Sequence, residues 1–212
     1  MSLDQVPVLH DEEELFNRTA HLFATASEIA CAARDLNTWA ASRPRAGVDQ
    51  VSKPRVRKLY RPGVLLNPST AQHLRTVAAT PDAEVRITTD DLNETIIIDR
   101  RFAILAGDLH DGRRGYGVVT EAAVVQNVMS LFEAAWRTGI DLDVYDAQHA
   151  ELASLAPRVL ELLASGCKDE TAARTLGLGV RTYRRRVAEL MSALGAESRF
   201  QAGARARDLG LI

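Results

Sequence analysis

The sequence contains little cysteine and has no long apolar run. Its 212 residues include two cysteines, Cys31 and Cys167, which lie far apart and lack a neighbouring cysteine at metal or redox spacing. This pattern argues against a disulfide framework or a structural zinc site, and it fits a reducing compartment. No apolar stretch approaches the roughly 20 residues that a membrane-spanning helix needs.

A secretory signal is also missing from the first residues. They run from Met1 to Gln5 into an acidic segment, without a basic start and an apolar stretch, so we expect no signal peptide and a cytoplasmic location. Hydrophobic residues make up 46% and charged residues 25% of the chain, which is typical of a soluble globular protein. The length predicts one or two domains with a core that needs no covalent staples.

Charge is distributed unevenly along the chain. Residues 152–212 carry ten lysines and arginines against six acidic residues, a net charge of +4. The preceding residues therefore carry −6 of the total charge of −2. A basic C-terminal segment on an acidic body suggests that this end meets an anion.

The first part of the chain predicts one long helix over residues 11–42, within an N-terminal segment over 1–47. Its apolar residues recur at helical spacing, and about thirty residues would span about 45 Å. They occupy more than one face: Leu15, Phe16, Leu22, Phe23, Ile29, Leu36 and Trp39. Two interpretations stay open, namely that the helix builds a dimer with a second copy or that it lies over its own sheet.

The body over residues 48–140 predicts a mixed α/β domain. Short runs rich in valine and isoleucine predict strands at 56–66, 84–88, 95–99, 102–106 and 117–119, the first interrupted at Pro62-Gly63. Helices are expected over 68–79 and 121–137. A linker is expected over 141–151, with a short strand at 142–145, and it leads to a wholly helical segment over 152–212.

That last segment contains the pattern of a helix-turn-helix. Helices are predicted over 155–165, 170–176 and 180–194, with Gly166 ending the first and Asp169 capping the second. Gly177-Leu178-Gly179 forms the turn before the third helix. The apolar face of the third helix carries Val180, Tyr183, Val187, Leu190, Met191 and Leu194, and its opposite face carries Arg181, Arg184, Arg185 and Ala188.

An arginine-rich face at this place favours DNA binding. The second helix of such a pair enters the major groove, and a guanidinium can pair with guanine or hold a phosphate. A surface helix can equally carry arginines for solubility, so the spacing alone leaves both interpretations open. We predict DNA contacts from Arg181, Thr182, Arg184, Arg185, Ala188 and Lys168.

The same segment resembles the C-terminal module of LuxR-type (GerE-like) regulators. The similar residues are Leu163-Ala164-Ser165-Gly166, Asp169-Glu170, Ala173-Arg174, Leu176-Gly177, Val180-Arg181-Thr182, Arg184-Arg185, Leu190-Met191, Leu194-Gly195-Ala196 and Ser198-Arg199-Phe200-Gln201-Ala202. The resemblance implies an all-α four-helix DNA-binding module, with Arg184 and Arg185 at positions where family members touch DNA.

Three positions depart from the pattern of that family. The usual Arg-Glu pair near the start of the module is replaced by Leu155-Ala156, the common capping serine of the recognition helix by Gly179, and a branched apolar residue by Ala172. These departures support an alternative function, in which a degenerate helix-turn-helix binds another regulator rather than DNA.

The body is similar to phospholipase D-like domains and to the effector domain of TrmB-like regulators. The resemblance lies in residues 84–88, 95–105, 117–119 and 131–136. Phospholipase D chemistry needs the motif HxKxxxxD, in which histidine is the nucleophile. If Asp99 is the aspartate, the histidine position falls on Leu92 and the lysine position on Glu94. We therefore expect a non-catalytic body and not an enzyme, with Asp99 as a structural residue at a strand end.

Other candidate sites in the body are weaker. A basic patch of Lys53, Arg55, Arg57, Lys58 and Arg61 can bind phosphate, or can protect the edge of a sheet. Trp39, Tyr60, Tyr116 and Trp136 are candidates for an effector pocket, although Trp136 has the spacing of a core residue. We expect no cofactor and no metal, since His110-Asp111 has no partner ligands at metal spacing.

The expected protein is a homodimeric, sequence-specific transcriptional regulator that binds double-stranded DNA, with an effector or protein partner still to be identified.

Overall fold

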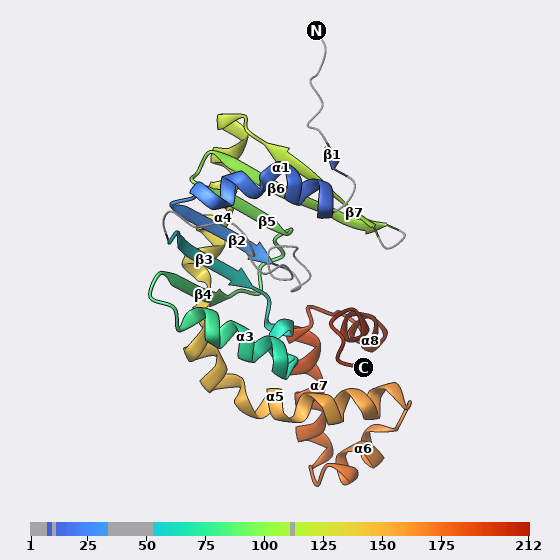
Figure 1. The fold of residues 1–212 in the computed structure, drawn as a ribbon. Helices are drawn as coiled ribbons and strands as arrows, with labels where there is room; N and C mark the ends of the chain where they lie inside the picture. The colour runs from blue at the N-terminus through green and yellow to red at the C-terminus, as the bar shows by residue number, and fades with distance from the viewer. Residues whose placement is uncertain (1–7, 10–11, 34–52, 111–112) are drawn as a thin grey trace.

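The computed structural model describes residues 8–9, 12–33, 53–110 and 113–212. One mixed sheet of eight strands forms the body, in the order β1-β7-β6-β5-β2-β3-β4-β8 (Figure 1). Its strands are β1 Val8–Leu9, β2 Glu28–Ala33, β3 Arg55–Tyr60, β4 Ala83–Ile87, β5 Thr95–Ile98, β6 Phe102–His110, β7 Arg113–Val119 and β8 Ile140–Asp141. Strands β2, β3 and β4 are parallel, and every other pair is antiparallel.

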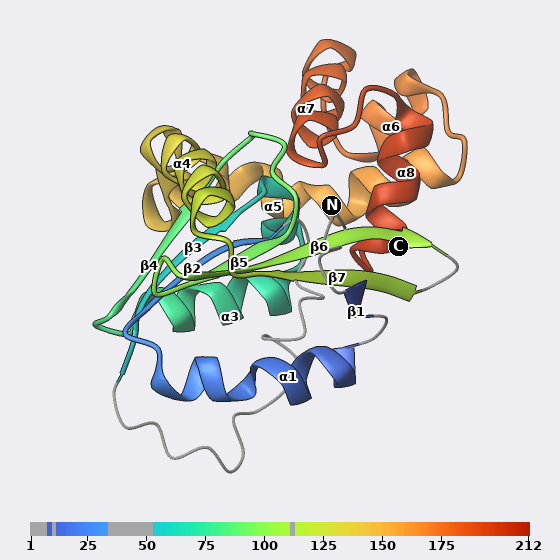
Figure 2. The same ribbon diagram turned by 90° about the horizontal axis from the view of Figure 1, so that it is seen from above.

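Helices cover both faces of the sheet. Helices α1 (Glu12–Thr25) and α3 (Pro68–Ala78) lie on one face, and α4 (Ala122–Thr138) lies on the other (Figure 2). Alternate residues of each strand enter the two cores, so that Ile29 and Cys31 pack toward α1 and α3 while Ala30 and Ala32 pack toward α4. A sheet covered on both faces explains why the central strands β2 and β5 read as almost continuous apolar runs.

The prediction of one helix over residues 11–42 is wrong. The helix ends at Thr25, and residues 28–33 form the central strand β2. The sequence of β2 is rich in alanine, a strong helix former, and burial on both faces removes the alternation that marks a strand. Leu15 is fully buried and its apolar neighbours pack in the same core, so packing against the sheet of its own chain accounts for the apolar faces of α1. Leu36 and Trp39 lie outside the described residues.

The segment predicted as a linker over residues 141–151 is helical, and the short strand predicted at 142–145 is wrong. Residues 142–151 form the first part of helix α5 (Leu142–Ala164), and the short strand of this region, β8, comes just before it. Leu142 belongs to the core of the body, whereas Leu152 and Val159 belong to a second core among the C-terminal helices. At 1.5 Å per residue the 23 residues of α5 extend about 35 Å. The helix thus links the two cores directly. The body also starts earlier than residue 48, since β1 and β2 belong to its sheet.

Other elements of the body agree with the sequence. The predicted strands and the helices over 68–79 and 121–137 are confirmed to within a few residues. The strand expected over 56–66 ends at Tyr60, and the proline-glycine pair begins a 3-10 helix, η1 (Pro62–Leu66), all of whose residues are buried. Among the described residues, no helix is both long enough and apolar enough to span a membrane.

Three further helices follow α5. They are α6 (Asp169–Thr175), α7 (Val180–Ala193) and α8 (Arg199–Asp208). After each of α5, α6, α7 and α8 comes a glycine with positive φ, where other residues would be strained: Gly166, Gly177, Gly195 and Gly210. The reversals at the first three of these glycines allow the four helices to pack around one apolar core.

Candidate nucleic-acid interface

Helix α7 has the two faces that its sequence predicts. Tyr183 and Leu190 are fully buried, with Val187 beside them in the core shared with α5, α6 and α8. The opposite row of Arg181, Arg184, Arg185 and Ala188 is exposed, and Thr182 is half-buried. A row at i, i+3, i+4 and i+7 forms one stripe along a helix. The predicted DNA-contacting residues of α7 therefore share one accessible side, with Thr182 at its margin.

A tight turn joins α6 to α7. The N–H of Leu178 donates to the carbonyl oxygen of Ala173 (2.8 Å), which closes the end of α6. Gly179 is the N-cap of α7, as predicted, and it offers no side-chain cap. Ala172 and Ala173 are buried, and their small side chains allow α6 and α7 to approach closely.

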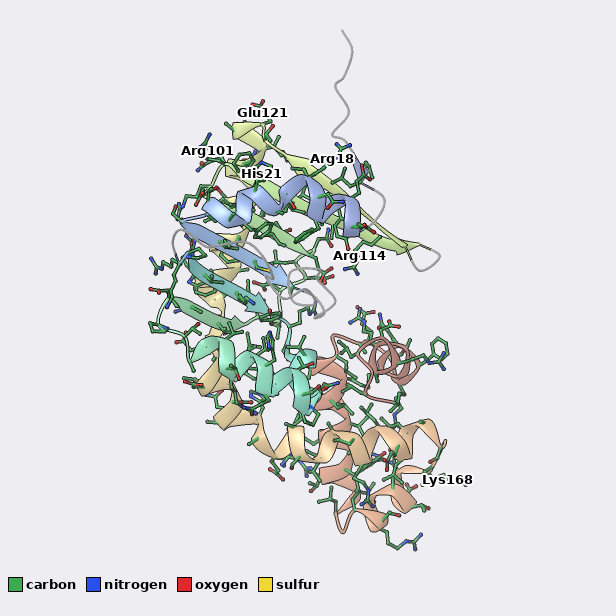
Figure 3. The ribbon with its side chains drawn as sticks, viewed as in Figure 1. Arg18, His21, Arg101, Arg114, Glu121 and Lys168 are labelled. Atoms are coloured by element: carbon green, nitrogen blue, oxygen red, sulfur yellow. The ribbon has the colours of Figure 1, made fainter. Side chains whose placement is uncertain are left out.

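The arginines and the lysine of this surface differ in the hydrogen bonds and ion pairs that their side chains make within the protein. Arg184 Nε donates to Asp169 Oδ2 (2.9 Å), and Arg185 Nε lies 3.7 Å from Glu189 Oε1. For the side chains of Arg181 and Lys168, no hydrogen bond or ion pair occurs within the described part of the chain. Lys168 directly precedes α6 and lies at the opposite end of the molecule from Arg101 and Glu121 (Figure 3).

Asp169 has a role that the sequence did not indicate. We expected it to cap α6, but the N-cap is Lys168 and Asp169 is the first residue of the helix. Its carboxylate instead binds Arg199 and Arg184, and these hydrogen bonds hold its pKa below the usual value. Arg199 is thirty residues away in the sequence, and no local pattern would have paired the two.

An ion pair joins α7 to α5, although the Arg-Glu pair expected from the resemblance to LuxR-type regulators is missing. Leu155 and Ala156, which stand at the positions of that pair, contribute to the apolar core of the C-terminal helices. Arg186, next to the exposed row, pairs with Glu151 on α5 and with Glu189 on its own helix. Its side chain is largely buried, so it braces the scaffold and does not belong to the accessible surface.

The basic patch predicted around β3 does not assemble. Arg57 is buried and donates to Glu28 (2.8 Å) and Glu133 (2.9 Å), and its guanidinium lies over the rings of Phe132 and Trp136. Arg55 pairs with Glu84, and Arg61 pairs with Asp91. Edge protection is not the reason for these cations either, because β3 lies between β2 and β4 inside the sheet.

The residues at the phospholipase D motif positions have structural partners. Asp99 follows β5, as expected, and its Oδ1 accepts hydrogen bonds from the Ser27 N–H, the Ser27 hydroxyl and the Glu28 N–H at 2.7–2.8 Å. Partial burial opposes ionisation, but these hydrogen bonds outweigh it and lower the pKa of Asp99. Glu94 is buried in an ion pair with Arg114. Neither carboxylate points to nucleophilic chemistry.

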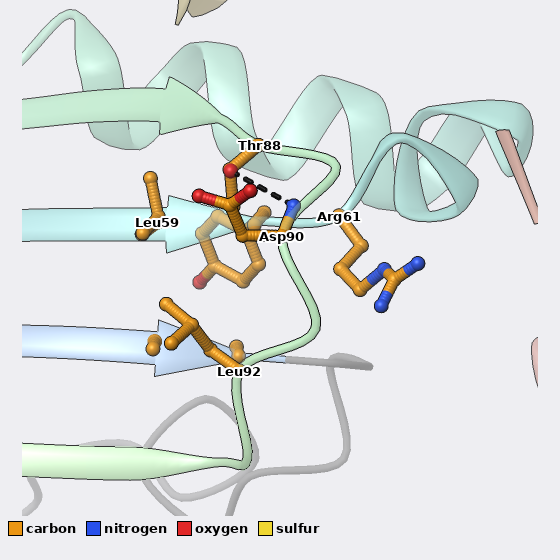
Figure 4. Close-up of a pocket in the computed structure, with 8 residues that line it drawn as sticks. Leu59, Arg61, Thr88, Asp90 and Leu92 are labelled. Carbon is orange, nitrogen blue, oxygen red and sulfur yellow. Dashed lines mark hydrogen bonds between the residues drawn. The ribbon is translucent and has the colours of Figure 1, made fainter. Parts of the chain in front are cut away.

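A small hollow lies at the carboxyl ends of the parallel strands, where open α/β sheets bind ligands (Figure 4). It is lined by Ala32, Ala33, Leu59, Tyr60, Arg61, Thr88, Asp90 and Leu92. Of the four aromatic residues proposed for an effector pocket, Tyr60 alone reaches it within the described chain. Tyr116 and Trp136 are buried in opposite cores, and Trp39 lies outside the described residues. No group of three or more metal-binding side chains occurs among the residues described.

Comparisons with known proteins give one sequence relative and several solved folds. The chain is 31% identical over 134 residues to the bialaphos biosynthetic pathway regulatory protein of Streptomyces hygroscopicus, a match that covers 63% of this chain and 52% of that protein. The chain thus spans about half the length of the curated relative it matches. No protein-family model matches the sequence.

Among solved structures, the phospholipase D family member Nuc from Salmonella typhimurium has a TM-score of 0.50 at 9% identity, over 65% of this chain and 97% of that one. NucT from Helicobacter pylori has a TM-score of 0.49 at 10% identity, over 64% and 97%. The archaeal chromatin protein TrmBL2 has 0.48 at 17% identity, over 66% and 55%. The α/β body of this chain therefore has a fold like that of Nuc, from the phospholipase D family.

Proposed function

We propose that the protein is a sequence-specific DNA-binding transcriptional regulator of the LuxR (GerE-like) type. Helices α6 and α7 are its helix-turn-helix, and α7 is the recognition helix. The observation that carries the proposal is the exposed row Arg181, Arg184, Arg185 and Ala188 on a helix whose other face packs into the core of the C-terminal helices. The likeness to a regulatory protein of Streptomyces hygroscopicus supports a regulatory role.

The chemistry of the row suits a nucleic acid. Side chains in the first turns of a recognition helix reach base edges, and other cations on the same surface bind the phosphates on either side. Lys168 contributes a further phosphate contact from the start of α6. The C-terminal segment has a net charge of +4, which provides the attraction between protein and DNA that depends on salt.

The body then serves as a non-catalytic effector or dimerisation domain. Its phospholipase D-like fold carries Leu92 and Glu94 where the catalytic motif has its histidine and lysine. Two copies of the chain would bind two half-sites about one DNA turn apart, which is the usual arrangement of helix-turn-helix dimers. The protein works in the cytoplasm, where its target is accessible.

The proposal is tested by DNA titrations at several salt concentrations. An Arg184→Ala/Arg185→Ala variant should lose about 1–3 kcal/mol of binding free energy for each base-reading arginine, or about one unit of salt slope for each phosphate contact. The matched control is Arg18→Ala/Arg101→Ala, which removes two exposed arginines from the body. The proposal would be contradicted if the first variant bound DNA as tightly as the unaltered protein, or if both variants lost DNA affinity equally.

One observation favours a second candidate function. Phe200, near the start of α8, is 88% exposed, and such aromatic side chains often anchor protein interfaces. In this alternative the helical segment binds another regulator. A Phe200→Ser variant that keeps full DNA affinity but loses regulation in cells would support the second function, whereas unchanged regulation would dismiss it.

A further inference from the structure

A single carboxylate, that of Asp169, binds two arginines from different helices. Arg199 on α8 donates through Nη1 to Oδ1 (2.9 Å) and through Nη2 to Oδ2 (3.2 Å). Arg184 on α7 donates through Nε to Oδ2 (2.9 Å). The Asp169 side chain is only 15% exposed, whereas that of Arg184 is 60% exposed. Asp169 thus joins the starts of α6 and α8 to the exposed row of α7.

The two arginines use different nitrogens, and this sets what each can still bind. Arg199 uses both terminal nitrogens on Asp169, so that its fork is occupied. Arg184 uses Nε, and its nearest other carboxylate oxygen, Glu170 Oε1, lies 3.6 Å from Nη2. That separation exceeds a normal hydrogen bond. The terminal nitrogens of Arg184 therefore stay available for a ligand while the other side of its guanidinium is fixed.

We infer that Asp169 is a positioning residue that holds Arg184 for reading a guanine in the major groove. The inference rests on the proposed function. Reading guanine requires two nitrogens of one guanidinium to meet N7 and O6 together, which is the commonest specific contact between a side chain and a base. An arginine that is fixed before binding loses less conformational freedom when it binds.

Asp169 also improves discrimination between DNA sequences, because it weakens the binding of Arg184 to DNA of any sequence. Its negative charge offsets part of the attraction of Arg184 for any phosphate, which is the term that gives non-specific affinity. Arg181, one helical turn earlier, has no such carboxylate in the described chain and suits a phosphate contact. The same helix thus carries one arginine that specifies sequence and another that strengthens binding to any duplex.

The experiment measures base discrimination with the full-length chain. The unaltered protein first selects its preferred duplexes from a random pool. Dissociation constants are then measured for the best duplex, for duplexes changed at one base pair each, and for a scrambled duplex. In Asp169→Asn, we expect discrimination at one G·C pair to fall roughly tenfold. The affinity of this variant for scrambled duplex should rise.

Two control variants separate positioning from charge and from folding. Glu170→Gln removes a neighbouring negative charge, so it should raise affinity for all duplexes alike. Arg199→Gln removes the other partner of Asp169, so it should lower the unfolding temperature and leave discrimination intact. In an Arg184→Ala background, adding Asp169→Asn should cause no further loss at the same base pair, because the arginine that Asp169 positions is already gone.

The results of these variants either support the inference or contradict it. Unchanged discrimination in Asp169→Asn, or an equal loss in Arg199→Gln, would overturn it. If Asp169→Asn does not fold, Asp169→Glu replaces it: this variant keeps the negative charge but moves the carboxylate, so it should lower discrimination at the same base pair and leave the affinity for scrambled duplex unchanged. Unchanged discrimination in Asp169→Glu would then overturn the inference. If the unaltered protein selects no sequence, the proposed function fails together with the inference. A selected sequence with an unaffected Asp169→Asn contradicts the inference alone.

Discussion

A β-carbon on Gly63 would lie 3.3 Å from the carbonyl oxygen of Ala193, so η1 packs directly against the last turn of α7. The same β-carbon would lie 3.1 Å from Leu209 Cδ1, beyond the end of α8. Leu66, at the end of η1, belongs to the core of the C-terminal helices. Since η1 follows Tyr60 and Arg61, which line the hollow, one short segment connects the sheet to the candidate recognition helix.

This contact predicts that a side chain at position 63 is costly. Gly63→Leu should lower the free energy of unfolding by about 1–3 kcal/mol, because the added atoms overpack a buried junction that includes a backbone oxygen. The matched control is Gly203→Ala in α8, where a β-carbon would meet no atom within 4 Å. It should raise stability by up to about 1 kcal/mol. Urea unfolding compares the two, and a neutral Gly63→Leu would contradict the contact.

Arg57 should contribute more to stability than Arg100, although both bind Glu28 and Glu133. The Arg57 side chain is 8% exposed and that of Arg100 is 58% exposed. Arg57→Ala leaves two partly buried carboxylates without this partner and uncovers Phe132. We therefore expect the free energy of unfolding to fall by about 3 kcal/mol. Arg100→Ala should cost at most about 1 kcal/mol. Thermal unfolding of both variants tests this, and equal losses would be inconsistent with the buried pairing.

Asp99 should contribute stability that depends on pH. Its folded-state pKa is lowered, so its charge stabilises the fold above the usual aspartate pKa of about 3.9, and this contribution is lost as pH falls through the folded value. In Asp99→Asn, the amide oxygen can accept the same bonds and asparagine tolerates the φ of +50°. The variant should be about 1 kcal/mol less stable at pH 7, and this difference should shrink as the pH falls through the lowered pKa of Asp99. Urea unfolding measures the free energy of unfolding of both proteins across this pH range. A difference between them that does not change with pH would contradict the prediction.

The body should not hydrolyse phosphodiesters. If Asp99 is the aspartate of the motif, Leu92 and Glu94 take the positions of the catalytic histidine and lysine, and Glu94 is paired with Arg114. Purified protein incubated with a chromogenic phosphodiester in the presence of a chelator should release no product above the buffer rate. Hydrolysis that disappears in Asp99→Ala would show that the body is an enzyme.

Elements with one polar and one apolar face could be predicted from the sequence. Helix α7 was expected over 180–194 and is found at Val180–Ala193, since arginines and core residues separate with the period of a helix. Strand β2 was missed for the opposite reason. Both its faces are buried, and alanines fill both, so the sequence has no alternation from which to recognise a strand.

The candidate site was predictable only in part. The exposed row of α7 follows from spacing along one helix, but the partners of its arginines come from other elements. The contact of Asp169 with Arg199 joins helices that are adjacent only in the folded chain. Arg57 likewise reads as part of a basic strand, and only the packing of α4 over β3 reveals its buried ion pairs.

The most direct test of DNA binding through α7 is the selection of duplexes from a random pool by the full-length protein at physiological salt. We expect enrichment of one motif, with half-sites about 10 base pairs apart if two copies bind together. The enrichment should disappear in Arg184→Ala/Arg185→Ala. Failure to enrich any sequence, or enrichment of the same motif by the double variant, would contradict it.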